Sequence, residues 1–148
     1  MYKHILVPTD GSKLSMAAVR TATRLAKEVG AKITSVYVMA PFSPPMESEA
    51  VAFYPAFSMG EFEKVTRQNA DEALAQVQAV ADAAKVSADG IAVRGPSPWK
   101  SIIATAKSKK ADLIVMASHG RRGLEALLIG SETQKVLTHS KIPVLVCR

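Results

Sequence analysis

Cysteine is almost absent from this chain. Its 148 residues include one cysteine, Cys147, so no disulfide can form within the chain. One thiol also cannot build a structural zinc site, and His4, His119 and His139 show no metal-ligand spacing with carboxylates. We therefore expect no metal site among these residues, and a reducing, cytoplasmic environment suits the protein.

Long hydrophobic runs are missing as well. No stretch reaches the roughly 18 apolar residues that a membrane-spanning helix needs. The opening sequence MYKHILVPTD lacks the pattern of a secretory signal peptide. With 48% hydrophobic and 22% charged residues, the composition is that of an ordinary globular domain. We expect one soluble, intracellular domain that covers residues 1–148 and has no membrane partner.

Aromatic residues are scarce, at 5% of the chain. The net charge of +6 favours anionic partners in general. The densest basic cluster, Lys107, Lys109 and Lys110, stands at the end of a predicted helix, where cations also offset the helix dipole. No aromatic side chain lies among these lysines to stack on bases. Nucleic acid is therefore not the expected partner.

The common signatures of nucleotide chemistry and of hydrolases are also missing. The chain has no GxxxxGK[ST] loop and no GxGxxG after its first strand pattern. No Ser-His-Asp set is evident from the sequence, although Asp10 and His119 both follow predicted strands and are candidates for a catalytic pair. Without a clear general base or a catalytic lysine, we assign no catalytic residue and expect any hydrolysis to be slow.

What the sequence does contain is a regular alternation of strand and helix patterns. Strand patterns, rich in β-branched residues, cover residues 4–8, 33–39, 90–95, 111–118 and 142–148. Helix patterns cover residues 13–29 and 60–85, begin again at Pro98, and cover 131–139. This alternation predicts an α/β fold: a single three-layer α/β/α domain with a five-stranded parallel sheet, Rossmann-like, with right-handed crossovers.

In such a sheet, ligands bind beyond the carboxyl ends of the strands, where the strand order reverses. The segments that follow predicted strands are therefore the places for a site: residues 8–12, 39–41, 95–97 and 117–131. The last of these is the most unusual. It lies in VMASHGRRGLEALLIGSETQKVL, residues 115–137, in which glycines punctuate an otherwise apolar run.

Two explanations fit these glycines. Gly120 and Gly123 permit positive φ and close approach to a ligand, and Gly130-Ser131 opens the final helix, whose free N–H groups attract anions. This pattern suits a phosphate. Alternatively, the glycines serve loop geometry and Ser131 caps its own helix. Arg121 and Arg122 either offset phosphate charge or are solvated loop residues.

A second unusual segment runs from residue 40 to about residue 58. It interleaves prolines and aromatics, and it is long for a connection in a compact domain. It is either a mobile loop or a lid or partner surface, and the sequence favours neither.

Three stretches resemble the universal stress protein family: ILVPTDGS, DLIVMASHGRRGLEALLIGS and VLTHSKIPVLV. The similarity extends over essentially the whole chain, residues 1–148. The nucleotide-binding branch of that family has the pattern G-x2-G-x9-G-[ST]. Gly120, Gly130 and Ser131 match its last three anchors, whereas Ala117 stands where the pattern has glycine. The resemblance implies a fold like that of the adenine nucleotide alpha hydrolases.

The resemblance also implies a site for ATP, or for ADP or AMP, with Mg or Mn as a possible companion ion. The base and ribose would meet six residues: Pro8, Thr9, Asp10, Val38, Met116 and Ala117. The phosphates would meet four: Gly120, Gly130, Ser131 and the amide of Glu132.

A homodimer formed through the C-terminal strand is a further implication of the resemblance. The function would be that of a stress-response regulator whose signal is nucleotide occupancy, with at most slow hydrolysis. The alternative is a dimeric stress-response interaction module that binds no nucleotide and acts through other protein partners. The glycine anchors favour the first function, and Ala117 favours the second.

Overall fold

The computed structural model describes residues 1–42, 59–120 and 129–148. Within these ranges, strands and helices alternate along the chain. The strands are β1 (His4–Pro8), β2 (Lys32–Met39), β3 (Ala88–Arg94), β4 (Leu113–Ala117) and β5 (Val144–Cys147). The helices are α1 (Lys13–Val29), α2 (Met59–Ala84), α3 (Pro98–Ser108) and α4 (Ser131–His139). The predicted fold class is confirmed, with strand bounds that differ from the expected ones by one or two residues at most ends.

All strand pairs are parallel, and the sheet order is β3-β2-β1-β4-β5. The chain builds β1, β2 and β3 outward in one direction and then crosses back to place β4 on the other side of β1. The order therefore reverses between β1 and β4. Their carboxyl ends flank the switch point at which α/β sheets bind ligands.

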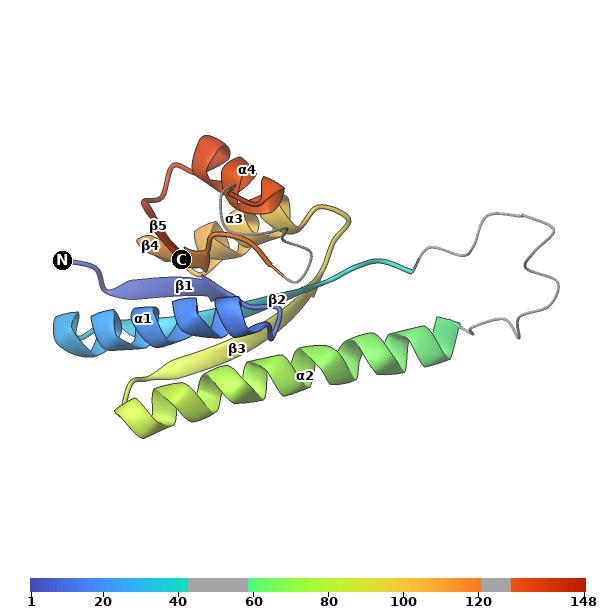
Figure 1. Cartoon of the computed structure of the whole chain (residues 1–148), viewed down its shortest axis with the longest axis horizontal. Coiled ribbons are helices and arrows are strands. Elements are labelled where there is room, and N and C mark those ends of the chain that lie inside the picture. Colours follow the sequence, from blue (N-terminus) through green and yellow to red (C-terminus); the bar gives the residue numbers. More distant parts are fainter. Residues whose placement is uncertain (43–58, 121–128) are drawn as a thin grey trace, which may run out of the picture.

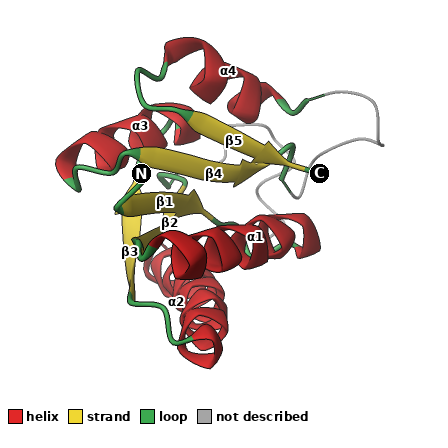
Figure 2. Ribbon diagram, turned by 90° about the vertical axis from the view of Figure 1, so that its left-hand side faces the viewer, coloured by secondary structure: helices red, strands yellow, loops and turns green. Residues whose placement is uncertain are grey.

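Helices α1 and α2 cover one face of the sheet, and α3 and α4 cover the other (Figures 1 and 2). On one face, Ile5 and Val115 of the strands pack with residues of α1 and α2, including Val77. On the other face, Leu6 and Ile114 pack with residues of α3 and α4. Successive strand residues point to opposite faces, so β1 and β4 are apolar at consecutive positions because both of their faces are buried.

The bounds of α1 follow from local chemistry. The side-chain oxygen of Ser12 accepts a hydrogen bond from the backbone N–H of Ser15 at 3.2 Å, as expected of an N-cap residue. Gly30 ends the helix in the left-handed region with φ of 69°. That conformation costs glycine little because it has no Cβ.

No helix within the described ranges is long and apolar enough to cross a membrane. Most of the proline-rich segment, residues 43–58, lies outside the described residues, as do Arg121, Arg122 and Gly123. The predictions made for them stay predictions.

Candidate functional site

A cavity of about 680 Å³ opens at the carboxyl ends of β1, β2 and β4. It lies at the switch point, where the strand order reverses. All ten residues proposed from the sequence line it: Pro8, Thr9, Asp10, Val38, Met116, Ala117, Gly120, Gly130, Ser131 and Glu132. The structure thus brings four separate segments to one place. That these residues bind a nucleotide stays a prediction.

The turn after β1 holds the Asp10 carboxylate at this cavity. The backbone N–H of Thr9 donates to the carbonyl of Val36 on β2 at 2.9 Å, which extends the sheet by one residue. Asp10 Oδ1 accepts from the backbone N–H of Ser12 at 2.9 Å, which closes a tight turn around Gly11, whose φ is 77°. The carboxylate is thereby oriented before any ligand arrives.

The threonine before Asp10 is also fixed. Thr9 is buried, and its hydroxyl lies 3.2 Å from the hydroxyl of Ser15 and accepts from the N–H of Gly11, also at 3.2 Å. Ser15 belongs to α1 and lines the cavity, although the sequence did not single it out. It stands on the buried face of its helix, and only the tertiary structure shows that this face reaches the cavity.

Gly120 is needed for clearance rather than for an unusual φ. A Cβ built on Gly120 would lie 2.7 Å from Oδ2 of Asp10. Within the described part of the chain, the glycines with positive φ are Gly11 and Gly30. Of the two properties that glycine permits at this position, the structure uses close approach, here to the Asp10 carboxylate, and not positive φ.

Gly130 closes the base of the loop after β4. Its N–H donates to the carbonyl of Ser118 at 2.8 Å. A Cβ on Gly130 would lie 2.9 Å from the Cβ of His119, closer than real Cβ contacts come, and 3.1 Å from its Cα, which is also tight. The φ of Gly130 is −58°, an ordinary value. Glycine is again required by clearance.

The first turn of α4 faces this junction. Gly130 is the N-cap residue, and Ser131 is the first residue of the helix. Within the described part of the chain no side-chain capping bond is made at this terminus, and the N-cap position belongs to Gly130 and not to Ser131, which was considered for that role. The first backbone N–H groups of a helix have no partner within the helix, and they lie at its positive end. At the cavity wall, these N–H groups are suited to an anion.

A buried threonine anchors this terminus. Thr133 is 3% exposed, and its hydroxyl donates to the carbonyl of Ala117 at 2.9 Å. The bond ties the first turn of α4 to the end of β4. Sequence reasoning missed Thr133, although its spacing of three residues from the buried Val136 was a signal for the inward face.

The Glu132 side chain serves a different helix. Its Oε2 accepts from the backbone N–H of Trp99 in the first turn of α3 at 2.9 Å, and its Oε1 lies 3.1 Å from Nζ of Lys135. The N-cap residue of α3, Ser97, makes no side-chain capping bond. The Glu132 carboxylate therefore caps α3, and Lys135 partly offsets its charge.

Ala117 is compatible with the local backbone. It is the last residue of β4 and pairs in register with Cys147 of β5. The non-glycine residues with positive φ in the described ranges are Lys85 and Lys110. The backbone at Ala117 thus needs no glycine, and the methyl group at the cavity wall is the whole difference from the motif.

His119 also lines the cavity, so the structure brings Asp10 and His119 to one site. His119 Nδ1 lies 3.1 Å from the hydroxyl of Ser118. The two residues were candidates for a catalytic pair, and no catalytic role is assigned to them. The described residues contain no cluster of three His, Cys, Asp or Glu side chains that could hold a metal ion.

Comparison with known proteins agrees with this architecture. The family model of the universal stress protein family matches residues 1–148. A universal stress protein of Methanocaldococcus jannaschii is 34% identical over 148 residues, which cover 100% of this chain and 83% of that protein.

Two solved structures share the fold. A universal stress protein in complex with cAMP is 28% identical, with a TM-score of 0.73, and the match covers 99% of this chain and 97% of that one. The universal stress protein UspA from Lactobacillus plantarum is 26% identical, with a TM-score of 0.78, and the match covers 99% and 98%. This chain belongs to the universal stress protein family.

Proposed function

We propose that this protein binds ATP, or a related adenine nucleotide, in the cavity at the carboxyl ends of β1, β2 and β4. The observation that carries the proposal is the junction at Gly130, where a helix N-terminus whose N-cap residue is a glycine opens onto a cavity of about 680 Å³. A universal stress protein structure with 28% identity is a complex with cAMP, an adenine nucleotide, which supports the proposal.

In this proposal, backbone N–H groups hold the phosphates. Gly130 and the first residues of α4, Ser131 and Glu132, provide amides at the positive end of the helix dipole. Ser131 is an exposed residue, and its hydroxyl would add one more donor. Gly120 precedes the loop that Gly130 follows, and a side chain at Gly120 would meet Asp10.

The nucleoside half would lie nearer β1 and β2. Asp10 accepts hydrogen bonds from ribose hydroxyls, and the turn that orients its carboxylate is already formed. Pro8 and Thr9 shape the same wall, and Val38 offers backbone groups to the base. Met116 and Ala117 form the floor below the ribose.

The charge of the described cavity wall bears on the role of a divalent ion. The described lining residues include the carboxylates of Asp10 and Glu132 and no lysine or arginine. Phosphate charge would therefore be met by helix dipoles and by an ion that enters with the nucleotide, such as Mg or Mn. We assign no catalytic residue, and we expect hydrolysis to be slow at most.

The biological role proposed is that of a cytoplasmic stress-response regulator that acts as a homodimer. The dimer contact would be the open edge of β5, where Leu145 is 40% exposed. The second candidate is a dimeric stress-response module that works without nucleotide. The methyl group of Ala117 at the cavity wall favours that candidate.

The deciding experiment is calorimetry with ATP, with and without Mg or Mn, on protein that has been unfolded and refolded to remove carried-over ligand. We expect a micromolar Kd. The variant Asp10→Ala should weaken binding at least tenfold. The matched control is Asp82→Ala, which removes an exposed carboxylate of α2 that interacts with Gln78. Absence of binding up to millimolar ATP would reject the nucleotide proposal in favour of the interaction module.

A further inference from the structure

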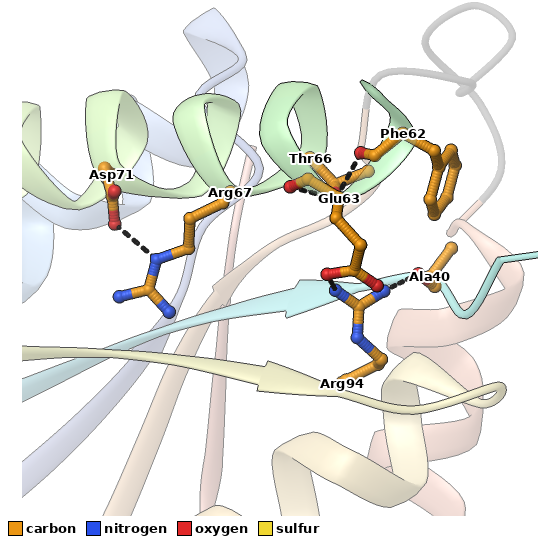
Figure 3. A network of polar contacts seen from close by, with 7 residues as sticks. All are labelled: Ala40, Phe62, Glu63, Thr66, Arg67, Asp71 and Arg94. Carbon is orange, nitrogen blue, oxygen red and sulfur yellow. Dashed lines mark hydrogen bonds and ion pairs between the residues drawn. The ribbon is translucent and has the colours of Figure 1, made fainter. Parts of the chain in front are cut away.

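The end of β2 is held by an arginine of the neighbouring strand (Figure 3). Arg94 is the last residue of β3 and pairs in register with Met39. Its Nη1 donates to the carbonyl of Ala40 at 2.9 Å, and its Nη2 lies 2.7 Å from Oε2 of Glu63 on α2. One guanidinium thus bridges the residue after β2 and the beginning of α2.

This bridge stands at the wall of the cavity. Val38 and Ala40 both line the cavity, and they are the residues on either side of Met39, where β2 ends. The ladder between β2 and β3 finishes with the N–H of Gly95, which donates to the carbonyl of Met39 at 3.1 Å. Ala40 lies beyond this ladder. The hydrogen bond from Arg94 therefore extends the fixed part of the wall by one residue.

An aromatic contact acts at the same point. The ring of Phe42, two residues after Ala40, packs edge-on against the ring of Phe62 at a centroid distance of 5.2 Å. Phe62 and Glu63 are adjacent on α2, and the hydroxyl of Thr66 donates to the carbonyls of both. The first turns of α2 thus present one polar and one aromatic contact to the chain that leaves β2.

The energetics indicate a local role for this bridge. The side chains of Arg94 and Glu63 are 32% and 49% exposed. Ion pairs this exposed contribute little to stability because water screens them. The planar guanidinium can, however, direct two separate N–H groups at two acceptors, which an ammonium group does with less orientation. What the bridge fixes is the position of the Ala40 carbonyl.

We propose that Arg94 is a positioning residue for the nucleoside half of the cavity. By holding Ala40 against β3 and α2, it keeps the wall formed by Val38 and Ala40 in the conformation that the base contacts. The phosphate half, at Gly130 and the first turn of α4, lies on the β4 side of the switch point and does not depend on it. This inference rests on the proposed function.

The test separates the two halves of the ligand. Dissociation constants for adenosine and ATP are measured for the wild type, Arg94→Ala, Arg94→Lys, Gly130→Ala and Arg67→Ala. Arg67 is the matched control: it is also an arginine in an exposed ion pair, with Asp71 on α2, and it makes no contact with Ala40 (Figure 3). Thermal unfolding of each variant shows that it is folded.

We expect Arg94→Ala to weaken the binding of adenosine and of ATP by the same factor, about tenfold, because only contacts to the nucleoside are disturbed. In Arg94→Lys, the logarithm of the dissociation constant should lie closer to that of Arg94→Ala than to that of the wild type. Gly130→Ala should weaken the binding of ATP and leave the affinity for adenosine unchanged. Arg67→Ala should behave as the wild type with both ligands.

Several results would overturn the inference. Wild-type affinity of Arg94→Ala for adenosine would show that the bridge does not position the wall. A loss confined to ATP, or a full rescue by lysine, would show that Arg94 acts through its charge. If the wild type bound neither adenosine nor ATP, the proposed function would fail together with the inference, whereas the other results leave the proposed function standing.

Discussion

The carboxylate of Glu132 on α4 accepts a hydrogen bond from the backbone N–H of Trp99 on α3 at 2.9 Å. One helix thus caps another, and the N-terminal turns of α3 and α4 are joined at the cavity. The rings of Trp99 and His139 pack at 4.5 Å and extend the same contact. A glutamate beside a proposed phosphate site has a structural reason to be there.

The first prediction concerns this interhelical cap. Glu132→Ala removes the acceptor and should destabilise the protein by about 1 kcal/mol, the usual effect of losing a cap. Glu132→Gln keeps an acceptor oxygen and should lose less than half as much. The measurement is urea unfolding at neutral pH. Equal losses in the two variants would show that the charge, through Lys135, matters more than the cap.

The second prediction contrasts the two glycines that need clearance. At Gly130, an added Cβ meets the Cβ and Cα of His119, atoms close to the backbone that cannot move easily. At Gly120, it meets the end of the Asp10 side chain, which can shift more easily than backbone atoms, although this disturbs its hydrogen bond to Ser12. We expect Gly130→Ala to weaken the binding of ATP at least tenfold, and Gly120→Ala to weaken it by a smaller factor.

Gly130→Val should abolish ATP binding while the protein stays folded. Calorimetry measures the affinities, and circular dichroism checks the fold. A greater loss at Gly120 than at Gly130 would contradict the clearance argument.

The third prediction is a pH dependence of stability that originates at His4. This imidazole is 7% exposed, and its Nε2 lies 2.8 Å from the hydroxyl of Thr34, which donates to Asp89 at 2.6 Å. Burial, together with the charge of Lys32, lowers the pKa of His4 despite the opposing effect of Asp89.

The unfolded chain therefore binds the His4 proton more readily than the folded protein does. Stability is complete above the unfolded pKa, about 6.5, and is lost as the pH falls from there toward the lowered folded value. The free energy of unfolding should fall between pH 7.5 and pH 5.5 in urea experiments, and His4→Gln should flatten this slope. An unchanged slope in the variant would assign the effect to other groups.

Asp112 also titrates differently in the folded protein, but at a lower pH than the range in which His4 acts. Burial raises its pKa, but hydrogen bonds from the backbone N–H groups of Lys3 and His4 to its carboxylate more than offset that effect, so the pKa of Asp112 is lowered overall. Its contribution to stability is present above its unfolded pKa and is lost only at more acidic pH. It does not interfere between pH 7.5 and pH 5.5.

The fourth prediction addresses the proposed dimer. The carbonyls of Pro143 and Cys147 accept from Ile114 and Ser118 on the β4 side. Because backbone groups alternate in direction along a strand, the N–H of Val146 points to the open edge of β5. Val146→Pro removes this donor without removing a bond to β4, and Pro is tolerated on edge strands. Sedimentation should show a monomer.

Leu137→Ser is the control for this experiment. It replaces a leucine of α4 that is 41% exposed, similar to Leu145, but lies on a helix. It should sediment as the wild type does. A dimeric Val146→Pro protein would exclude pairing through the edge of β5.

Much of this architecture was already specified locally. The bounds of β1 and α4 agree with the sequence prediction because an apolar run between polar turns, or a glycine before a periodic segment, is a local signal. Ser12 and Gly30 bound α1 for a similar reason, because a serine before and a glycine after a periodic segment are local cap signals. Strand ends in a parallel sheet share one edge, which predicted the segments where a site would lie, and the family resemblance supplied the individual cavity residues.

The sequence by itself therefore determined the alternation of elements, the caps of α1 and the family motif. The tertiary structure alone decided which distant groups meet. The glutamate that caps α3 comes from α4, and the arginine that holds Ala40 comes from β3, 54 residues further along the chain. Such contacts depend on strand order and helix packing, which join residues far apart in sequence, and local patterns carry no information about them.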